Sequence, residues 1–173
     1  MNPGSGRTLI GSGRRAPARL LALLLAGAAL AAPQALSAQA QRAATAPVPD
    51  QMTLSKLLWS TMAAVDQANK TGNYSVLRDL GSPGFQANNN AAALAAVFAS
   101  IRAQRLDLSD TLLVAPTYEF APAIVQPGVL RMRGRFPLRP IAVAFDLVYE
   151  WDESWQLHGI AILSVGMNEP ARR

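Results

Sequence analysis

The sequence predicts an α+β fold, with three N-terminal helices packed on an antiparallel sheet of about four strands. The sheet is indicated by three segments with a two-residue alternation of side chains, residues 129–136, 141–151 and 155–165. This alternation is typical of strands, because successive side chains point to opposite faces of a sheet. Short turn segments separate the three, which predicts antiparallel pairing. Apolar residues at helical spacing between residues 54 and 104 indicate the helices.

The three helices are expected over residues 54–70, 74–80 and 91–104. Thr53 is the expected N-cap of the first helix, and Gly72 is its expected C-terminal stop. The second helix should end at a Gly-Ser-Pro-Gly segment and lead into a short extended piece at Phe85 and Gln86. Asparagines can cap the third helix, whose expected buried residues are Leu94, Val97, Phe98 and Ile101.

The sheet is expected to begin with a long strand over residues 111–119. Two prolines, Pro116 and Pro122, fall within or just after this segment. Because proline cannot donate a hydrogen bond to a strand ladder, the first strand should lie at an edge of the sheet or be bent.

The next two strands are expected to form a hairpin around a proline-rich turn, with Phe136 opposite Ile141. In that register Arg131 lies opposite Asp146, and the two charges should pair. A second hairpin, around an Asp-Glu-Ser turn, should place Trp151 opposite Trp155 and Tyr149 opposite Leu157. Aromatic cross-strand pairs favour such a hairpin.

The outer face of this sheet is the expected interaction surface. An apolar strip among arginines on an otherwise solvated face suggests a partner surface. A solvated face on which the arginines prevent aggregation is the alternative. Gly159 leaves a further possibility open, since a bulge there would turn the following residues to the other face. The interface candidates are Arg131, Arg133, Arg135, Val148, His158, Ile160 and Ile162.

Residues 1–40 have the composition of an export signal. Arginines at 14, 15 and 19 precede an apolar run over residues 20–32, and small residues favour cleavage after Ala40. The run is shorter than the ~20 residues of a membrane-spanning helix. We therefore expect a periplasmic or secreted protein with no stable membrane span after processing. The Arg14-Arg15 pair leaves a twin-arginine export route as an alternative.

Composition defines the remaining organisation of the chain and excludes some functions. Residues 41–51 are expected to be a disordered linker, 52–166 one domain and 167–173 a polar tail. The net charge of +5 includes four arginines in the first forty residues, which contain no acid. The rest of the chain therefore has twelve basic and eleven acidic residues. This nearly neutral body argues against nucleic acid binding. With no cysteine and one histidine, His158, we expect neither a metal site nor a cofactor.

The order of the expected elements resembles the nuclear-transport-factor-2-like superfamily, and in particular its uncharacterised secreted bacterial members. The matching features are a long first helix, a short second one, a third helix and consecutive strands ending in Trp-Gln-Leu-His-Gly-Ile-Ala-Ile. The resemblance covers about residues 52–165. It implies a cone of helices on a strongly curved sheet, a dimer formed through the open sheet face, and a pocket at the mouth of the cone. Enzymatic members place an acid and a tyrosine in that pocket. No matching motif occurs here, so no catalytic residue is carried over.

Two classes of function remain. The leading hypothesis is a secreted, non-enzymatic module that binds a small apolar ligand or a protein partner. The alternative is an isomerase- or hydrolase-like enzyme, which would require Glu119 or Asp146 to point into the pocket. The residues expected to line a ligand pocket are Trp59, Met62, Phe98 and Phe145.

Overall fold

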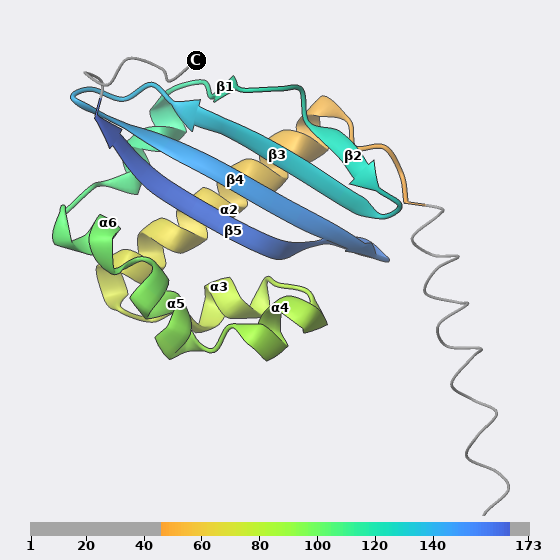
Figure 1. Ribbon diagram of the computed structural model, residues 1–173, viewed down its shortest axis with the longest axis horizontal. Helices are drawn as coiled ribbons and strands as arrows, with labels where there is room; N and C mark the ends of the chain where they lie inside the picture. The colour runs from red at the N-terminus through yellow and green to blue at the C-terminus, as the bar shows by residue number, and fades with distance from the viewer. Residues whose placement is uncertain (1–45, 167–173) are drawn as a thin grey trace, which may run out of the picture.

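The computed structural model describes residues 46–166 (Figure 1). The predicted signal peptide, the first five residues of the predicted linker and the predicted tail lie outside the described residues. The helices are α2 (Gln51–Thr71), α3 (Ser75–Asp79), α4 (Pro83–Asn88), α5 (Ala91–Val97), α6 (Ala99–Ala103) and the 3-10 helix η1 (Leu108–Leu113). The strands are β1 (Thr117–Tyr118), β2 (Ala123–Gln126), β3 (Val129–Phe136), β4 (Ile141–Asp152) and β5 (Ser154–Gly166).

The fold is α+β, with the helices preceding a curved antiparallel sheet of five strands. The strand order is β1-β3-β4-β5, and β2 also pairs with β3. In Figure 1 the long helix α2 crosses behind the sheet, and α3, α4 and α5 lie beyond the edge formed by β5. Within residues 46–166, no helix combines the length and the apolar character that crossing a bilayer requires.

Helix α2 begins earlier than predicted and ends where predicted. Asp50, not Thr53, is its N-cap, and the Asp50 Oδ1 accepts a hydrogen bond of 2.7 Å from the Thr53 backbone N–H. At the C-terminus, Gly72 has a left-handed φ of 74° and its N–H donates to the Ala68 carbonyl. Glycine adopts this conformation without steric cost, so the predicted stop is confirmed.

The extended piece predicted at Phe85 and Gln86 is wrong, because these residues belong to helix α4. Ser82 accepts a hydrogen bond from the Phe85 N–H, and Pro83 occupies the first turn. Serine at the N-cap and proline at the first helical position start a helix as readily as they end one. The Ser-Pro-Gly segment therefore breaks the helical region, as predicted, but it leads into another helix rather than into an extended segment.

The predicted third helix is broken in two at Phe98. This residue has φ −93° and ψ 10°, and it separates α5 from α6. Asn90 caps α5 by accepting a hydrogen bond of 2.8 Å from the Ala93 N–H. Val97, the last residue of α5, is 55% exposed, so its predicted burial is wrong. The other three predicted core residues, Leu94, Phe98 and Ile101, are at most 1% exposed.

The first strand is shorter than predicted. Thr111 lies in η1, where its hydroxyl donates a hydrogen bond of 2.6 Å to the Leu108 carbonyl. The edge strand is then divided into β1 and β2, and both pair with β3. Pro122 lies in the gap between them, and both segments lie at the edge of the sheet beside β3, so the predicted edge position of the first strand is confirmed.

The predicted register of the β3–β4 hairpin is wrong by two residues. Phe136 pairs with Val143 rather than Ile141, and Arg131 pairs with Val148 rather than Asp146. The connection is therefore longer than the four-residue turn that was assumed. A slip of one residue would exchange the two faces of the strand, whereas a slip of two preserves them. The predicted inner and outer faces of β3 and β4 consequently remain correct.

The second hairpin contains a bulge next to Gly159, the alternative that this glycine indicates. Trp151 pairs with Trp155 and Tyr149 with Leu157, as predicted, but Val148 then pairs with Gly159. His158 is the additional residue of the bulge. From Gly159 onward, each side chain of β5 therefore points to the sheet face opposite to the predicted one.

The exchange places two interface candidates inside the protein. Ile160 pairs with Leu147 and Ile162 with Phe145, so both face the core. Ile162 is 5% exposed, and Ile160 packs against the core cluster. Their predicted position on the outer face is therefore wrong.

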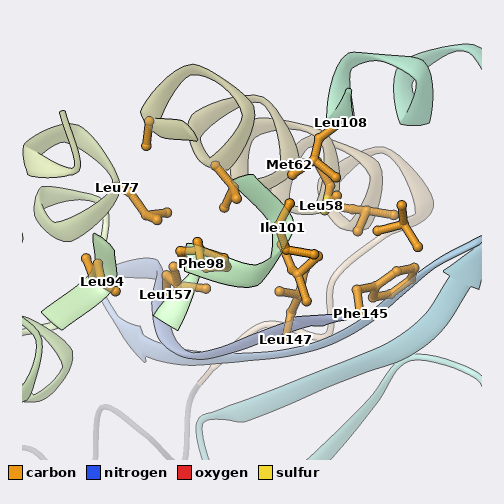
Figure 2. Close-up of a cluster of buried hydrophobic side chains, with 14 of the residues drawn as sticks. Leu58, Met62, Leu77, Leu94, Phe98, Ile101, Leu108, Phe145, Leu147 and Leu157 are labelled. Carbon is orange, nitrogen blue, oxygen red and sulfur yellow. The ribbon is translucent and has the colours of Figure 1, made fainter. Parts of the chain in front are cut away.

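The core lies between the sheet and the helices, as Figure 2 shows for residues from both layers. One buried tyrosine hydroxyl makes hydrogen bonds between the sheet and helix α2 within this core. The buried Tyr149 hydroxyl donates to the Leu57 carbonyl at 2.9 Å and lies 2.9 Å from the Thr61 hydroxyl. Burial raises the pKa of Tyr149, so the phenol stays neutral. Its hydrogen bond to Leu57 connects β4 to α2.

Candidate functional site

The four predicted pocket residues belong to the core or pack against it. Met62 and Phe98 have no accessible surface and Phe145 is 2% exposed. Trp59 packs on Phe136 with ring centroids 5.2 Å apart, and Phe136 lies 5.3 Å from Phe145. A side chain with no accessible surface borders no cavity large enough for water. The space beside Met62 and Phe98 is therefore filled by protein, as in ordinary close packing.

The outer face of the sheet carries a chain of four charged residues. Arg131 binds Asp146 with two bonds, from Nε to Oδ1 at 2.8 Å and from Nη2 to Oδ2 at 2.5 Å. Arg133 lies 3.9 Å from the same carboxylate and 2.9 Å from Glu119 Oε2. The predicted pairing of Arg131 with Asp146 is thus confirmed, although the two residues are diagonal rather than opposite.

These contacts change the titration of both members of the main pair. The hydrogen bonds from Arg131 hold the pKa of Asp146 below its ordinary value, against a smaller opposing effect of burial. The same hydrogen bonds raise the pKa of Arg131. Both residues are charged at neutral pH, and the outer face therefore presents charges of both signs.

A hollow of about 150 Å³ lies beside this charged chain on the outer face. Leu163 on the edge strand β5 borders it, and this side chain is 62% exposed. Small residues, the charged side chains and Phe145 form the remaining boundary. The lining residues are Glu119, Arg133, Gly134, Ala144, Phe145, Asp146, Ala161 and Leu163. We call this group, with Arg131, the outer-face patch.

The predicted interface candidates do not include Ala161 and Leu163, the apolar part of the outer-face patch. Ala161 and Leu163 occupy the positions that Ile160 and Ile162 were predicted to hold, because the bulge shifts the alternation by one residue. Gly159 was the signal for this shift. Of the other candidates, Arg135 is exposed opposite Ala144, and Val148 is partly exposed between Arg131 and Gly159.

His158 joins the sheet to α4. Its Nδ1 lies 3.0 Å from the Ser82 hydroxyl and 3.0 Å from Glu150 Oε2. A nucleophilic triad requires the serine and the acid on different ring nitrogens, whereas here both contact the same one. Ser82 is also only 1% exposed and caps α4. This serine, histidine and glutamate therefore form a structural link.

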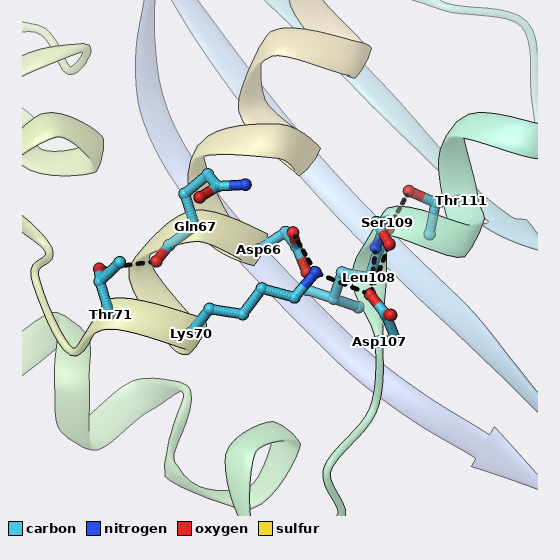
Figure 3. A network of polar contacts seen from close by, with 8 residues as sticks. All are labelled: Asp66, Gln67, Lys70, Thr71, Asp107, Leu108, Ser109 and Thr111. Atoms are coloured by element: carbon cyan, nitrogen blue, oxygen red, sulfur yellow. Dashed lines mark hydrogen bonds and ion pairs between the residues drawn. The ribbon is translucent and has the colours of Figure 1, made fainter.

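A second polar network joins α2 to η1, as Figure 3 shows. Lys70 Nζ donates to Asp66 Oδ2 at 2.9 Å and to Asp107 Oδ1 at 3.1 Å. Asp107 also accepts hydrogen bonds from the hydroxyl and the N–H of Ser109. The Ser109 hydroxyl, followed by Lys70, lowers the pKa of Asp107 to about 2. Each acid in this network is committed to a partner, and none is available as a general base.

The two acids proposed for an enzyme both lie on the outer face. Glu119 and Asp146 contact arginines there and do not point into the core. Within residues 46–166, no group of three or more histidine, cysteine or acidic side chains is arranged to hold a metal ion. Among the described residues, the outer-face patch is the arrangement that combines a hollow, an exposed apolar side chain and paired charges.

No protein-family model matches the chain, and neither a curated protein nor a solved structure matches it.

Proposed function

We propose that this chain is an exported, non-enzymatic interaction module that binds a second copy of itself through the outer-face patch. The observation that carries the proposal is the exposed Leu163 beside a hollow of about 150 Å³ on the same sheet face. A protruding leucine and an adjacent hollow form a self-complementary surface. In a two-fold dimer, the same patch on each copy supplies both the knob and the hole.

The charges of the patch favour the same arrangement. Arg133 lies between Glu119 and Asp146, at 2.9 and 3.9 Å, and about half of its side chain is exposed. When two such faces meet around a two-fold axis, arginines of one copy can approach acids of the other. Complementary charges of this kind fix the orientation of two partners more than they add affinity.

A protein partner is favoured over a small apolar ligand by the packing of the core. The candidate pocket residues Met62 and Phe98 are fully enclosed by other side chains. A ligand there would have to displace core residues, whereas docking on the outer face needs no rearrangement. Membership of the nuclear-transport-factor-2-like superfamily is part of this proposal, and it is supported by the order of helices followed by a curved antiparallel sheet. Export is supported by the sequence of residues 1–40 alone.

Replacing Leu163 with aspartate is expected to dissociate the dimer. The new carboxylate would be buried in the hollow of the second copy beside Glu119 and Asp146, whose arginine partners are already engaged. If this burial costs about 3 kcal/mol of the dimerisation free energy, the dissociation constant of the dimer increases by about a hundredfold. Sedimentation equilibrium of the exported protein at several concentrations measures this constant directly.

The matched control is Leu113→Asp. Leu113 is 82% exposed and lies in η1, which packs against α2 rather than on the outer sheet face. This variant should dimerise like the unsubstituted protein. A protein that sediments as a single chain at every concentration, or an equal effect of both substitutions, would reject the proposed interface.

A further inference from the structure

Strand β5 has an open edge over its second half. It is the last strand of the sheet order, and it is 13 residues long. In the described part of the chain, β5 makes backbone hydrogen bonds outside the sheet only at Leu157, with Leu80 and Ser82. Alternate backbone groups of an edge strand point away from the sheet. The groups of Gly159–Gly166 that do so have no backbone partner among residues 46–166.

The opposite edge of the sheet is protected from pairing. Strand β2 is four residues long, and its register with β3 shifts between Ile124 and Gln126. Pro122 precedes it and Pro127 follows it. Short length, an irregular register and flanking prolines are devices that keep an edge strand from binding another chain.

The open part of β5 has none of these devices. Residues 160–166 read Ile-Ala-Ile-Leu-Ser-Val-Gly, with no charged residue and no proline. The register with β4 is regular from Gly159 to Gly166. Long, uncharged and regular edge strands are templates for the addition of another strand. An edge of this kind is normally selected against unless it is used.

The chain itself already pairs with this edge at one position of its first half, Leu157. Gly81 forms a parallel bridge with Leu157, and the Ser82 N–H donates to the Leu157 carbonyl at 2.8 Å. The added segment turns away into α4 after Ser82. The open edge is therefore the continuation of a pairing surface that the fold already occupies with an extended segment.

We propose that the β5 edge over Gly159–Gly166 binds an extended, uncharged segment of another polypeptide by adding it as a sixth strand. Main-chain hydrogen bonds would supply the affinity, and alternate side-chain contacts the selectivity. The choice of a different polypeptide rests on the proposed dimer. If the edges of two copies paired with each other, face-to-face dimers would be linked into larger assemblies.

A peptide with the sequence of the strand itself is a suitable probe, because it is uncharged and forms β-structure. The probe is Gly-Ile-Ala-Ile-Leu-Ser-Val-Gly with two lysines and a fluorophore added for solubility and detection. Its anisotropy is expected to rise saturably with the concentration of the exported protein. A matched peptide methylated on alternate backbone nitrogens should bind at least tenfold more weakly, because it cannot complete the ladder.

Two further measurements locate the site and separate it from the dimer interface. Amide hydrogen exchange should show new protection at residues 160–166 when the peptide binds. Arg133→Glu, a substitution in the outer-face patch on β3, should weaken dimerisation and leave peptide binding unchanged. The inference is overturned if the peptide does not bind saturably, if methylation has no effect, or if protection appears elsewhere. It is also overturned if the edges of two copies pair with each other, seen as concentration-dependent protection of residues 160–166 without peptide that persists undiminished in Arg133→Glu.

Discussion

Phe98→Ala is expected to lower the free energy of unfolding by about 3–5 kcal/mol, the usual cost of truncating a fully buried phenylalanine. Phe98 has no accessible surface and stacks on Tyr74, with ring centroids 6.0 Å apart and planes 3° from parallel. It also stands at the junction between α5 and α6. The truncation would leave a cavity between the helices and the sheet that rigid neighbours cannot fill.

Truncation of the adjacent residue, Val97→Ala, is the matched control for the loss of stability expected from Phe98→Ala. Val97 is 55% exposed, so its truncation should change the free energy of unfolding by no more than about 0.5 kcal/mol. Urea denaturation of both variants at one protein concentration makes the comparison, since dimerisation adds to apparent stability. Similar losses for the two variants would contradict the burial of Phe98 and the exposure of Val97 described above.

Gly134→Ala is expected to destabilise the protein by about 1–3 kcal/mol through overpacking. A Cβ on Gly134 would lie 2.5 Å from the Thr117 carbonyl oxygen and 2.9 Å from the Tyr118 Cα. Both atoms belong to the backbone of β1, and the ring of Phe145 is 3.0 Å away on a third side. The strand would have to separate from β3 to admit a methyl group.

Gly166→Ala tests whether this effect is specific to the crowded position. A Cβ on Gly166 meets nothing within 4 Å, and the residue lies at the end of β5. Thermal unfolding should show a clear decrease of the melting temperature for Gly134→Ala and almost none for Gly166→Ala. If Gly134→Ala were as stable as the unsubstituted protein, β1 could not lie as close to β3 as described.

The strands were predictable because their signals are local. Alternation along β3, β4 and β5 defined the inner face, and the aromatic pair Trp151–Trp155 fixed the register next to the tight turn. The hairpin between β3 and β4 failed in register because its proline-rich connection is longer than the sequence suggested. The error had no effect on the faces, since it was an even number of residues.

The candidate site was only half predictable. Arg131 and Asp146 are charged residues on a strand face whose direction the alternation gave correctly. Leu163 could not be found in the same way, because one additional residue at His158 reverses every later side chain of β5. A bulge depends on how the whole strand fits its neighbour. Gly159 indicated that possibility without deciding it.

Helix boundaries in the region of α3 to α6 also depend on tertiary contacts that local sequence does not reveal. Serine, proline and glycine at residues 82–84 end one helix and begin another, and local propensity does not separate the two outcomes. What decides it is the addition of the segment around Gly81 to β5 at Leu157, a contact between residues far apart in the sequence. The division of the third helix at Phe98 is likewise set by the packing of this side chain under the sheet.

Cross-linking through Ala144→Cys tests the proposed dimer most directly. The chain contains no cysteine, so the variant carries a single thiol, placed in the hollow of the outer-face patch on the inner strand β4. Face-to-face packing brings the two thiols close, whereas pairing along the β5 edges would separate them by three strand spacings, about 14 Å. We predict a disulfide-linked dimer for Ala144→Cys under mild oxidation and none for Leu113→Cys, whose position is 82% exposed. Absence of the Ala144→Cys cross-link at concentrations where the protein is dimeric would contradict the assignment of the outer face as the interface.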